Sequence, residues 1–307
     1  MSQPGEVGCS GISKLYGDGK RALTSVSFTI PAKGIFAVIG RNGAGKTTLA
    51  RIMSTLLEPT SGTAWIDGVD VMVGAKKLRE RMAVVPQEGR TVAWMTPQQT
   101  VSSYLLWRGL SYKEAKNRAE EAVARVGLER QANVLNRRLS GGMKRKVLVA
   151  MAVASDAEFI FLDEPSTGLD PISRKELWAL LTELGRERFL FLTTHYLEEA
   201  EEVADRVAIL DRGRLLALGS LDELRRGLRY QFSLRVPYSS KVEVVEGEVI
   251  ARRDGQQIVT TKEEAQRISK RLVEEGMDFS VNPVALNEIF DYTVARAGNR
   301  DEREDED

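Results

Sequence analysis

Short apolar runs alternate with amphipathic stretches along most of the chain. Three runs are almost wholly apolar and predict buried strands: Gly34–Gly40, Phe159–Leu162 and Phe189–Thr193. Other stretches repeat apolar residues at helical spacing and predict helices: Lys46–Leu57, Tyr112–Val126 and Arg174–Gly185. Because strands buried on both faces alternate with helices, the pattern predicts an α/β layer with a largely parallel sheet.

Two shorter strand patterns accompany this layer. Ser25–Ile30 and Ala64–Ile66 read as strands of an antiparallel β edge, with Asp67–Gly68 as a turn. A helical subdomain is expected over about 88–154, between the strands of the parallel sheet. We therefore expect residues 1–221 to form one large domain.

The composition changes near Ser220, and the later pattern predicts a second, small α+β domain over 222–299. Its predicted elements are a strand at Tyr230–Val236, a hairpin turning at Asp254–Gly255, a helix over Glu263–Glu275 that Gly276 ends, and a last helix. Asn282 and Pro283 are expected to start that last helix as N-cap and first-turn proline. Apolar residues near Phe290 and Tyr292 are expected to hold two copies together, and the acidic tail 300–307 is expected to be disordered.

Composition narrows the functional classes. Lys+Arg and Asp+Glu both number 44 among 307 residues, so the net charge of zero argues against a nucleic-acid partner. The single cysteine, Cys9, cannot form an intrachain disulfide and fits a reducing compartment. We expect no signal peptide in Met1–Gly11, and no apolar run approaches the ~20 residues that span a bilayer. Any membrane role therefore predicts a separate chain that crosses the bilayer.

A phosphate-binding loop follows the first buried strand. The residues from Gly40 to Thr47, GRNGAGKT, match the pattern GxxxxGK[ST] between a predicted strand and a predicted helix. Glycines let backbone N–H groups turn toward phosphate oxygens, Lys46 would reach the β and γ phosphates, and Thr47 would hold Mg²⁺. The alternative is a chance match to this pattern, which would occur in about one in a hundred random chains of this composition. The loop residues expected to contact nucleotide are Gly40, Asn42, Gly43, Gly45, Lys46, Thr47 and Thr48.

Two carboxylates end the second buried strand, in Phe159–Pro165. Asp163 suits a Mg²⁺ contact, and Glu164 suits a general base that polarises the attacking water. Paired acids at a strand end are more often a solvated loop, but the phosphate loop makes the catalytic interpretation the better one.

A second anion site is predicted ahead of the helical run Lys144–Ala154. Leu139-Ser-Gly-Gly-Met143 offers a hydroxyl at Ser140, backbone N–H groups at Gly141 and Gly142, and a helix N-terminus. Read alone, the same residues would be a loop with an N-cap serine.

The order of these motifs resembles an ABC-transporter nucleotide-binding domain over Ile12 to about Leu221. The ordered set comprises the phosphate loop, Gln87 in VVPQ, LSGGM, FLDEP, Ser166–Asp170 (STGLD) and Thr194-His195. Met143 stands where many members have glutamine, a form also found in drug- and lipid-export cassettes. The fold that the resemblance implies is a phosphate-loop NTPase core with a helical subdomain.

The resemblance also implies roles for single residues. Tyr16 would stack on adenine, and Gln87 would sense Mg²⁺ and the attacking water and link the site to a membrane partner. His195 would hydrogen-bond the γ-phosphate. Ser140 and Gly142 would grip ATP bound to a second copy, and Asp170 would lie at the dimer seam. Each residue also has a structural alternative, such as ordinary packing for Tyr16 or a surface position for His195.

The implied function is an ATP-hydrolysing, Mg²⁺-dependent motor subunit of a transporter. We expect a separate transmembrane permease and a second nucleotide-binding subunit, forming a homodimer, as partners, and a peripheral position on the cytoplasmic face of the membrane. Pro283–Phe290 resembles the end of drug-resistance, sodium-export and lipid-export cassettes that pair with ABC-2 type permeases, which favours an exporter.

The alternatives are a soluble ABC-class ATPase in DNA repair or translation and a kinase-like or GTPase phosphate-loop protein. The first class usually carries long insertions or two cassettes on one chain, and the second would lack Gln87, LSGGM and His195 in this order.

The segment Glu88–Leu110 is rich in large apolar residues. We expect about half of them to fill the core of the helical subdomain and the others to line a groove for a partner's helix. They are Val92, Trp94, Met95, Tyr104, Leu105, Leu106 and Trp107.

Overall fold

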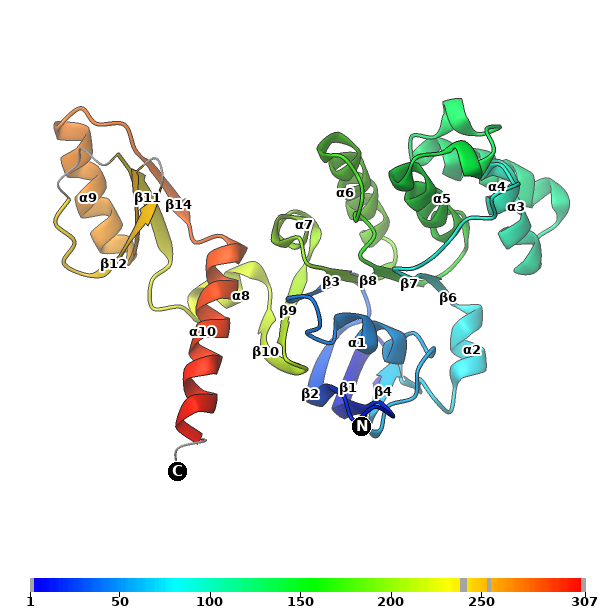
Figure 1. The fold of residues 1–307 in the computed structure, drawn as a ribbon, viewed down its shortest axis with the longest axis horizontal. Coiled ribbons are helices and arrows are strands. Elements are labelled where there is room, and N and C mark those ends of the chain that lie inside the picture. The colour runs from blue at the N-terminus through cyan, green and yellow to red at the C-terminus, as the bar shows by residue number, and fades with distance from the viewer. Residues whose placement is uncertain (1–2, 238–241, 253–254, 305–307) are drawn as a thin grey trace. The chain divides into compact units, whose positions relative to one another are not determined.

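The computed structural model describes residues 3–237, 242–252 and 255–304 (Figure 1). The chain divides into two compact units, with the boundary between Leu218 and Gly219. Each unit is described by itself.

A six-stranded sheet forms the centre of the first unit, in the order β10-β9-β3-β8-β7-β6. The strands are β3 (Gly34–Ile39), β6 (Met82–Val85), β7 (Phe159–Asp163), β8 (Phe189–Thr194), β9 (Arg206–Asp211) and β10 (Arg214–Gly219). All recorded pairings among β9, β3, β8, β7 and β6 are parallel. The three strands predicted from apolar runs are confirmed as β3, β7 and β8, and the α/β phosphate-loop fold is confirmed with them.

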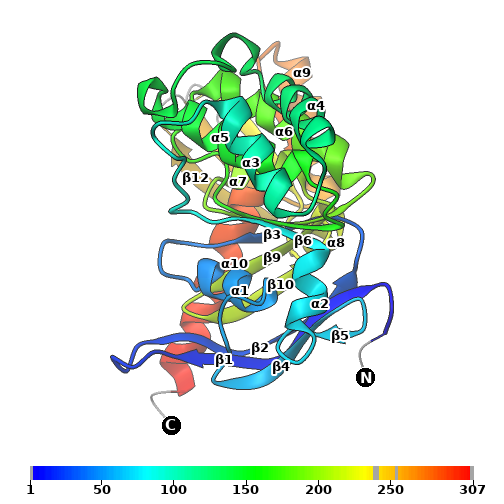
Figure 2. The same ribbon diagram turned by 90° about the vertical axis from the view of Figure 1, so that its right-hand side faces the viewer.

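A separate antiparallel sheet lies on the other side of α1 (Lys46–Met53). Its order is β2-β1-β4-β5, with the strands β1 (Glu6–Leu15), β2 (Arg21–Pro31), β4 (Ser61–Ile66) and β5 (Val69–Asp70). Phe28, Ile52 and Phe191 belong to one buried cluster, so the two sheets and α1 share a core. Figure 2 shows α1 between the two sheets. The expected antiparallel edge is therefore a sheet of its own. The turn at Asp67–Gly68 is as predicted, with both residues at positive φ.

Helix α1 is shorter than the sequence predicts. It ends at Met53 instead of Leu57, because Thr55 adopts a left-handed conformation with φ of 64°. The amide of Leu56 then donates to the carbonyl of Arg51 at 2.8 Å, which closes the helix end. The remaining helices of the layer are α2 (Ala75–Glu80), α6 (Pro171–Gly185) and α7 (Leu197–Val203).

Three helices gather apart from the rest of the layer within the span 88–154 (Figure 1). They are α3 (Pro97–Trp107), α4 (Tyr112–Arg125) and α5 (Gly141–Ala154). Capping boxes at Thr96 and Ser111 fix the starts of α3 and α4. Helix α4 buries Ala115, Ala119 and Ala122, and these small side chains allow close packing against its neighbours.

The second unit is a four-stranded antiparallel sheet with helices, in the strand order β12-β13-β11-β14. Its elements are α8 (Leu221–Arg226), β11 (Phe232–Val236), β12 (Gly247–Arg252), β13 (Gly255–Thr260), α9 (Lys262–Glu274), β14 (Ser280–Pro283) and α10 (Leu286–Glu304). The predicted apolar face of α9 is confirmed, since Ala265, Ile268 and Leu272 join Leu234 and Ile258 in a core. Gly276 follows α9 at a φ of 65°, as its expected role requires.

Several predictions for this unit are wrong. Asn282 and Pro283 do not begin a helix; they end the edge strand β14, where Pro283 lies opposite Phe232. A proline is tolerated there because an edge strand leaves one row of N–H groups unpaired. Phe290 is only 6% exposed and so is not available to join two copies, whereas Tyr292 is 41% exposed, and pairing through this helix stays a prediction.

Helix α10 continues to Glu304, so residues 300–304 are helical where a disordered tail was expected. A helix that is already nucleated extends readily through arginine and glutamate. Residues 305–307 and Asp254 of the predicted hairpin turn lie outside the described residues.

Candidate nucleotide-binding and hydrolysis site

The predicted site residues follow the ends of four neighbouring strands, at one edge of the parallel sheet. The phosphate loop follows β3, Glu164 follows β7, His195 follows β8, and Gln87 lies two residues beyond β6. In the sheet β3 pairs with β8, β8 with β7, and β7 with β6. Because the carboxyl ends of parallel strands share one edge, residues far apart in sequence converge there.

The phosphate loop requires glycine at two positions for different reasons. Gly45 has a φ of 104°, a conformation that other residues rarely adopt. At Gly40 a Cβ atom would lie 2.2 Å from the carbonyl oxygen of Leu210, so only glycine fits beside β9. Lys46, at the start of α1, is 5% exposed, and its Nζ donates to the carbonyl oxygens of Gly40 at 2.9 Å and Arg41 at 3.2 Å. The lysine is therefore held at the mouth of the loop.

Asp163 lies between two hydroxyl groups. Thr47 Oγ1 donates to Asp163 Oδ1 at 3.1 Å, and Thr193 Oγ1 donates to the same oxygen over a shorter distance. A carboxylate and a hydroxyl at this separation, beside a phosphate loop, form the set of hard oxygen donors that Mg²⁺ prefers. The two residues predicted to contact Mg²⁺, Thr47 and Asp163, thus lie within hydrogen-bond distance of each other.

Glu164 is the meeting point of the predicted catalytic residues. Its Oε2 atom lies 3.3 Å from Gln87 Nε2 and 3.1 Å from His195 Nδ1, although the histidine contact lacks hydrogen-bond alignment. Thr167 Oγ1 donates to the same oxygen at 3.2 Å, and Lys46 Nζ lies 3.7 Å from Glu164 Oε1. Burial lowers the pKa of Lys46, and the carboxylates of Glu164 and Asp163 oppose that shift.

The backbone of Glu164 is strained. Its φ of 50° is left-handed, which costs on the order of 1–3 kcal/mol for a residue that is not glycine. The Glu164 amide donates to the Thr193 carbonyl oxygen at 3.0 Å, so the neighbouring strand holds this conformation. The strain turns the carboxylate, which is at the end of β7, toward Gln87 and the phosphate loop.

A cavity of about 450 Å³ joins these groups to Tyr16. The Tyr16 hydroxyl lies 3.2 Å from Thr48 Oγ1, which places the ring beside the first turn of α1. The lining residues are Tyr16, Lys20, Ala22, Asn42, Gly43, Gly45, Lys46, Thr47, Thr48, Gln87 and Glu164. The structure thus brings most of the predicted nucleotide and catalytic residues to one hollow.

Ser140, Gly142 and Asp170 lie elsewhere, in a second cavity of about 450 Å³. The lining residues recorded for it include none of those around the first cavity. The Ser140 hydroxyl accepts from the Met143 amide at 3.2 Å and caps α5. Asp170 caps α6 in the same way, and its hydrogen bonds from backbone amides lower the pKa of its carboxyl group. Gly141 belongs to the same first turn of α5 as Gly142.

Two residues of the site are not predicted by the sequence patterns. Thr193, which donates to Asp163, could have been found because it is a polar residue at the end of the strand next to β7. Arg145 is 7% exposed and bonds backbone carbonyls beneath the site. An arginine inside a helical pattern normally indicates a solvent-facing position, so no sequence signal marked it.

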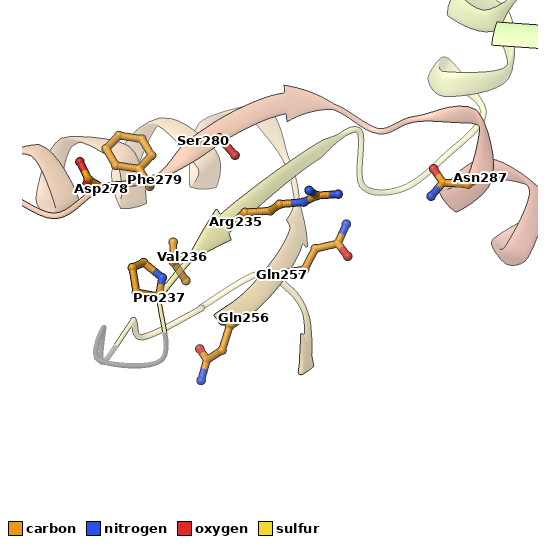
Figure 3. A pocket seen from close by; sticks show the side chains of 10 residues that line it. Arg235, Val236, Pro237, Gln256, Gln257, Asp278, Phe279, Ser280 and Asn287 are labelled. Atoms are coloured by element: carbon orange, nitrogen blue, oxygen red, sulfur yellow. The ribbon is translucent and has the colours of Figure 1, made fainter. Parts of the chain in front are cut away.

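The second unit has a larger cavity, of about 560 Å³, on its own sheet (Figure 3). Arg235, Gln256, Gln257 and Asn287 line it together with Phe279. It contains no phosphate loop and none of the paired carboxylates. The nucleotide chemistry therefore belongs to the first unit, although the two cavities described there are smaller.

The apolar segment before and within α3 is largely exposed. Trp94 is 75% exposed and Trp107 is 90% exposed, and Val92 and Leu106 are exposed as well. Leu105 is buried, and Met95 and Tyr104 are half-buried. Of the seven side chains, one is buried, two are half-buried and four are exposed, so fewer than the expected half are fully buried in the subdomain core.

Comparison with known proteins agrees with this geometry. The sequence profile of the family described as ABC transporter matches residues 23–167, which include the phosphate loop, Gln87, the Ser140 turn and Glu164. The chain is 38% identical over 216 residues to the daunorubicin resistance ATP-binding protein DrrA3 of Streptomyces coeruleorubidus, covering 70% of this chain and 68% of that protein. The chain belongs to the ABC transporter family.

Other relatives agree with this assignment. Daunorubicin/doxorubicin resistance ATP-binding protein DrrA of Streptomyces peucetius is 36% identical over 71% of this chain, and the match spans 66% of that protein's length. The human retinal-specific phospholipid-transporting ATPase ABCA4 is 36% identical over 66% of this chain, but the match spans only 9% of that protein. The shared region is thus the cassette itself.

Solved structures of ABC cassettes show the same fold. The dimeric cassette MJ0796 bound to ADP and phosphate has a TM-score of 0.63 at 26% identity, covering 70% of this chain and 98% of that one. An ATP-binding subunit of an ABC transporter has the same TM-score at 30% identity, covering 72% and 92%. This ABC chain is therefore an ATP-hydrolysing cassette with an adenine-nucleotide site.

Proposed function

We propose that this chain is the motor subunit of an ABC exporter. Two copies would close head to tail around two ATP molecules, and the closure would drive a separate transmembrane permease. The observation that carries the proposal is the division of the nucleotide-binding groups between two cavities of one chain.

Head-to-tail pairing explains that division. The cavity at Lys46 and Glu164 holds the groups for phosphate, metal and water, whereas Ser140, Gly142 and Asp170 present an anion-binding helix start in another cavity. Because the recorded linings of the two cavities share no residue, we propose that a second copy supplies the Ser140 turn to the nucleotide at Lys46. The cassette MJ0796, which is dimeric with ADP and phosphate bound, supports pairing of two copies.

The residues at the strand ends then have defined tasks. Lys46 and the loop amides bind the β and γ phosphates, and Tyr16 stacks on adenine. Thr47, Asp163 and Gln87 would hold Mg²⁺, which supplies charge neutralisation on the phosphate oxygens. Glu164 accepts a proton from the attacking water.

Positioning is the main contribution of the remaining groups. Gln87 and His195 flank the Glu164 carboxylate, so they can orient the water and the γ-phosphate.

An exposed apolar surface supports the permease as partner. Trp94, Leu106 and Trp107 expose large side chains on the segment that follows Gln87. Helices that dock on a partner protein use apolar anchors, which exposed residues of this kind can receive. No helix among the described residues is both long enough and apolar enough to span a bilayer. We propose that a cytoplasmic helix of the permease occupies this surface, which places the chain at the cytoplasmic face of the membrane.

Export is the direction that the relatives support. The DrrA proteins are named for drug resistance, and ABCA4 is named a phospholipid transporter. We propose a hydrophobic or amphipathic cargo, selected by the permease. A soluble ABC-class ATPase in DNA repair or translation is not favoured by these relatives, and we propose no nucleic-acid partner.

Partner binding tests the transporter assignment. Trp94→Ser with Trp107→Ser should abolish co-purification with a co-expressed partner permease and leave ATP hydrolysis by the isolated chain unchanged. Val73→Ser is the matched control, because Val73 is 92% exposed and lies outside this segment. Undiminished permease binding by the double variant would refute the proposed docking surface.

A further inference from the structure

The guanidinium group of Arg145 lies between the ends of strands β6 and β7. Arg145 is in the first turns of α5 and is 7% exposed. On one side its Nη1 atom donates to the carbonyl oxygens of Pro86 at 2.7 Å and Gln87 at 3.2 Å. On the other side its Nη2 atom donates to the carbonyl oxygens of Asp163 and, at 3.1 Å, of Glu164. One side chain thus bonds the backbone on both sides of a gap.

The gap has a cause in the sequence. Strands β6 and β7 pair in register until Val85 lies opposite Leu162. The next position on β6 is Pro86, which has no N–H group and cannot continue the ladder. The two strands therefore separate beyond this point, and their backbone carbonyl groups need hydrogen-bond donors other than each other's N–H groups. A guanidinium, with five donors in a fixed plane, can serve carbonyls on both sides at once.

The two sides of the gap carry the two ends of one catalytic contact. The Gln87 side chain reaches from the β6 side to the Glu164 carboxylate on the β7 side, at 3.3 Å. We propose that Arg145 is a positioning residue that sets the distance between Gln87 and Glu164. This inference rests on the proposed function, because it assigns Arg145 a role in hydrolysis at that same site.

Arg145 is itself a residue of helix α5, so the distance between Gln87 and Glu164 depends on the position of that helix. Helix α5 begins after its N-cap Ser140, the turn that we assign to the nucleotide of a second copy. A shift of α5 when Ser140 engages that nucleotide would move the Pro86–Gln87 and Asp163–Glu164 backbones together. The arginine thereby connects the part of the chain that serves the partner's ATP with the residues that hydrolyse its own.

Charge is not the main contribution of Arg145. The side chain bonds four backbone carbonyls and none of the neighbouring carboxylates. Burial lowers the pKa of Arg145, while the charges of Asp163 and Glu164 oppose the shift. An arginine remains charged at physiological pH in either case, so its geometry is what a substitution tests.

Arg145→Lys keeps the charge but cannot bond both sides of the gap. We expect its kcat for ATP hydrolysis to fall ~10- to 100-fold, the loss expected when a reacting group is displaced by about 1 Å. The Kd for ATP should change by less than about threefold, since the Lys46 loop is untouched. Arg188→Lys is the matched control, because Arg188 donates to the Ser155 carbonyl oxygen at 2.8 Å, beyond the other end of α5. It should keep wild-type kcat.

A double-mutant cycle separates positioning from general stability. If Arg145 acts through Gln87, then Gln87→Ala should cost far less kcat in the Arg145→Lys protein than in the wild type. Hydrogen exchange should also quicken in a peptide covering residues 86–94 of Arg145→Lys and not of Arg188→Lys. Additive losses, or equal losses from both lysine variants, would overturn the inference.

The ATPase assignment is checked in the same assay. Wild-type hydrolysis that Lys46→Ala abolishes establishes the proposed function before Arg145 is considered. Absence of that hydrolysis would instead overturn the proposed function and the inference together. Should Arg145→Lys fold poorly, Arg145→Gln gives the same comparison with a shorter, neutral side chain that also cannot bond both sides of the gap.

Discussion

Replacing Glu164 by glutamine should stop hydrolysis and preserve nucleotide binding. The change keeps the side chain's shape, but it removes the basic carboxylate that lies beside Gln87 and His195. Loss of a general base slows a reaction by ~100-fold or more, which corresponds to about 2.7 kcal/mol of barrier.

Binding of ATP should be equal or tighter in Glu164→Gln. Lys46 Nζ lies 3.7 Å from Glu164 Oε1, and both side chains are buried. The gross Coulomb attraction at that distance is about 4 kcal/mol at an effective dielectric constant of 20. Removing it frees the lysine for phosphate and takes one negative charge away from the triphosphate.

Phosphate release and light scattering measure the two effects. With saturating Mg-ATP we expect at least ~100-fold slower turnover and a stable dimer that the wild type forms only transiently. Glu158→Gln is the control, because Glu158 lies just before the same strand and pairs with Arg81 at 2.7 Å, away from the site. Normal turnover in Glu164→Gln, with only monomer present, would refute the assignment of Glu164 as the base.

Three further outcomes are expected. Lys46→Ala should lose tight ATP binding in equilibrium titration, because no other side chain of the loop brings a buried positive charge to the phosphates; wild-type affinity would contradict this. Truncation after Gly219 should preserve ATP binding per chain but raise the protein concentration needed for full ATPase, if the second unit holds two copies together. An unchanged concentration dependence would exclude that role. Burial raises the pKa of the Cys9 thiol to about 12, so a maleimide should label it at pH 8 only after unfolding, as mass spectrometry can show.

The parallel core and its edge of functional residues are predictable from the sequence because their signals are local. Apolar runs ending in glycine or in paired acids mark β3 and β7, and the structure brings Asp163 to Thr47 as their motifs imply. The sequence does not predict the order of the strands in the parallel sheet. That order places Glu164 beside Gln87 and His195.

The failures have physical reasons. Asn-Pro is a strong helix-start signal, but at Asn282–Pro283 pairing with β11 outweighs it. The end of α1 depends on a left-handed Thr55, a conformation that no composition rule would assign to a β-branched residue. Arg145 was missed because its role arises from a gap between two strands, and that gap exists only once the sheet has formed.

The most direct test of the proposal that two copies share each ATP site is to mix two variants, each of which should be inactive alone. Lys46→Ala removes the phosphate lysine, and Ser140→Arg blocks the helix start that we assign to the partner's ATP. In a head-to-tail pair of the two variants, one site carries both defects and the other carries neither. Mixing equal amounts should therefore restore about a quarter of wild-type ATPase, since random pairing gives half mixed dimers with one intact site each. Full activity of Ser140→Arg on its own, or no recovery on mixing, would contradict a site shared between two copies.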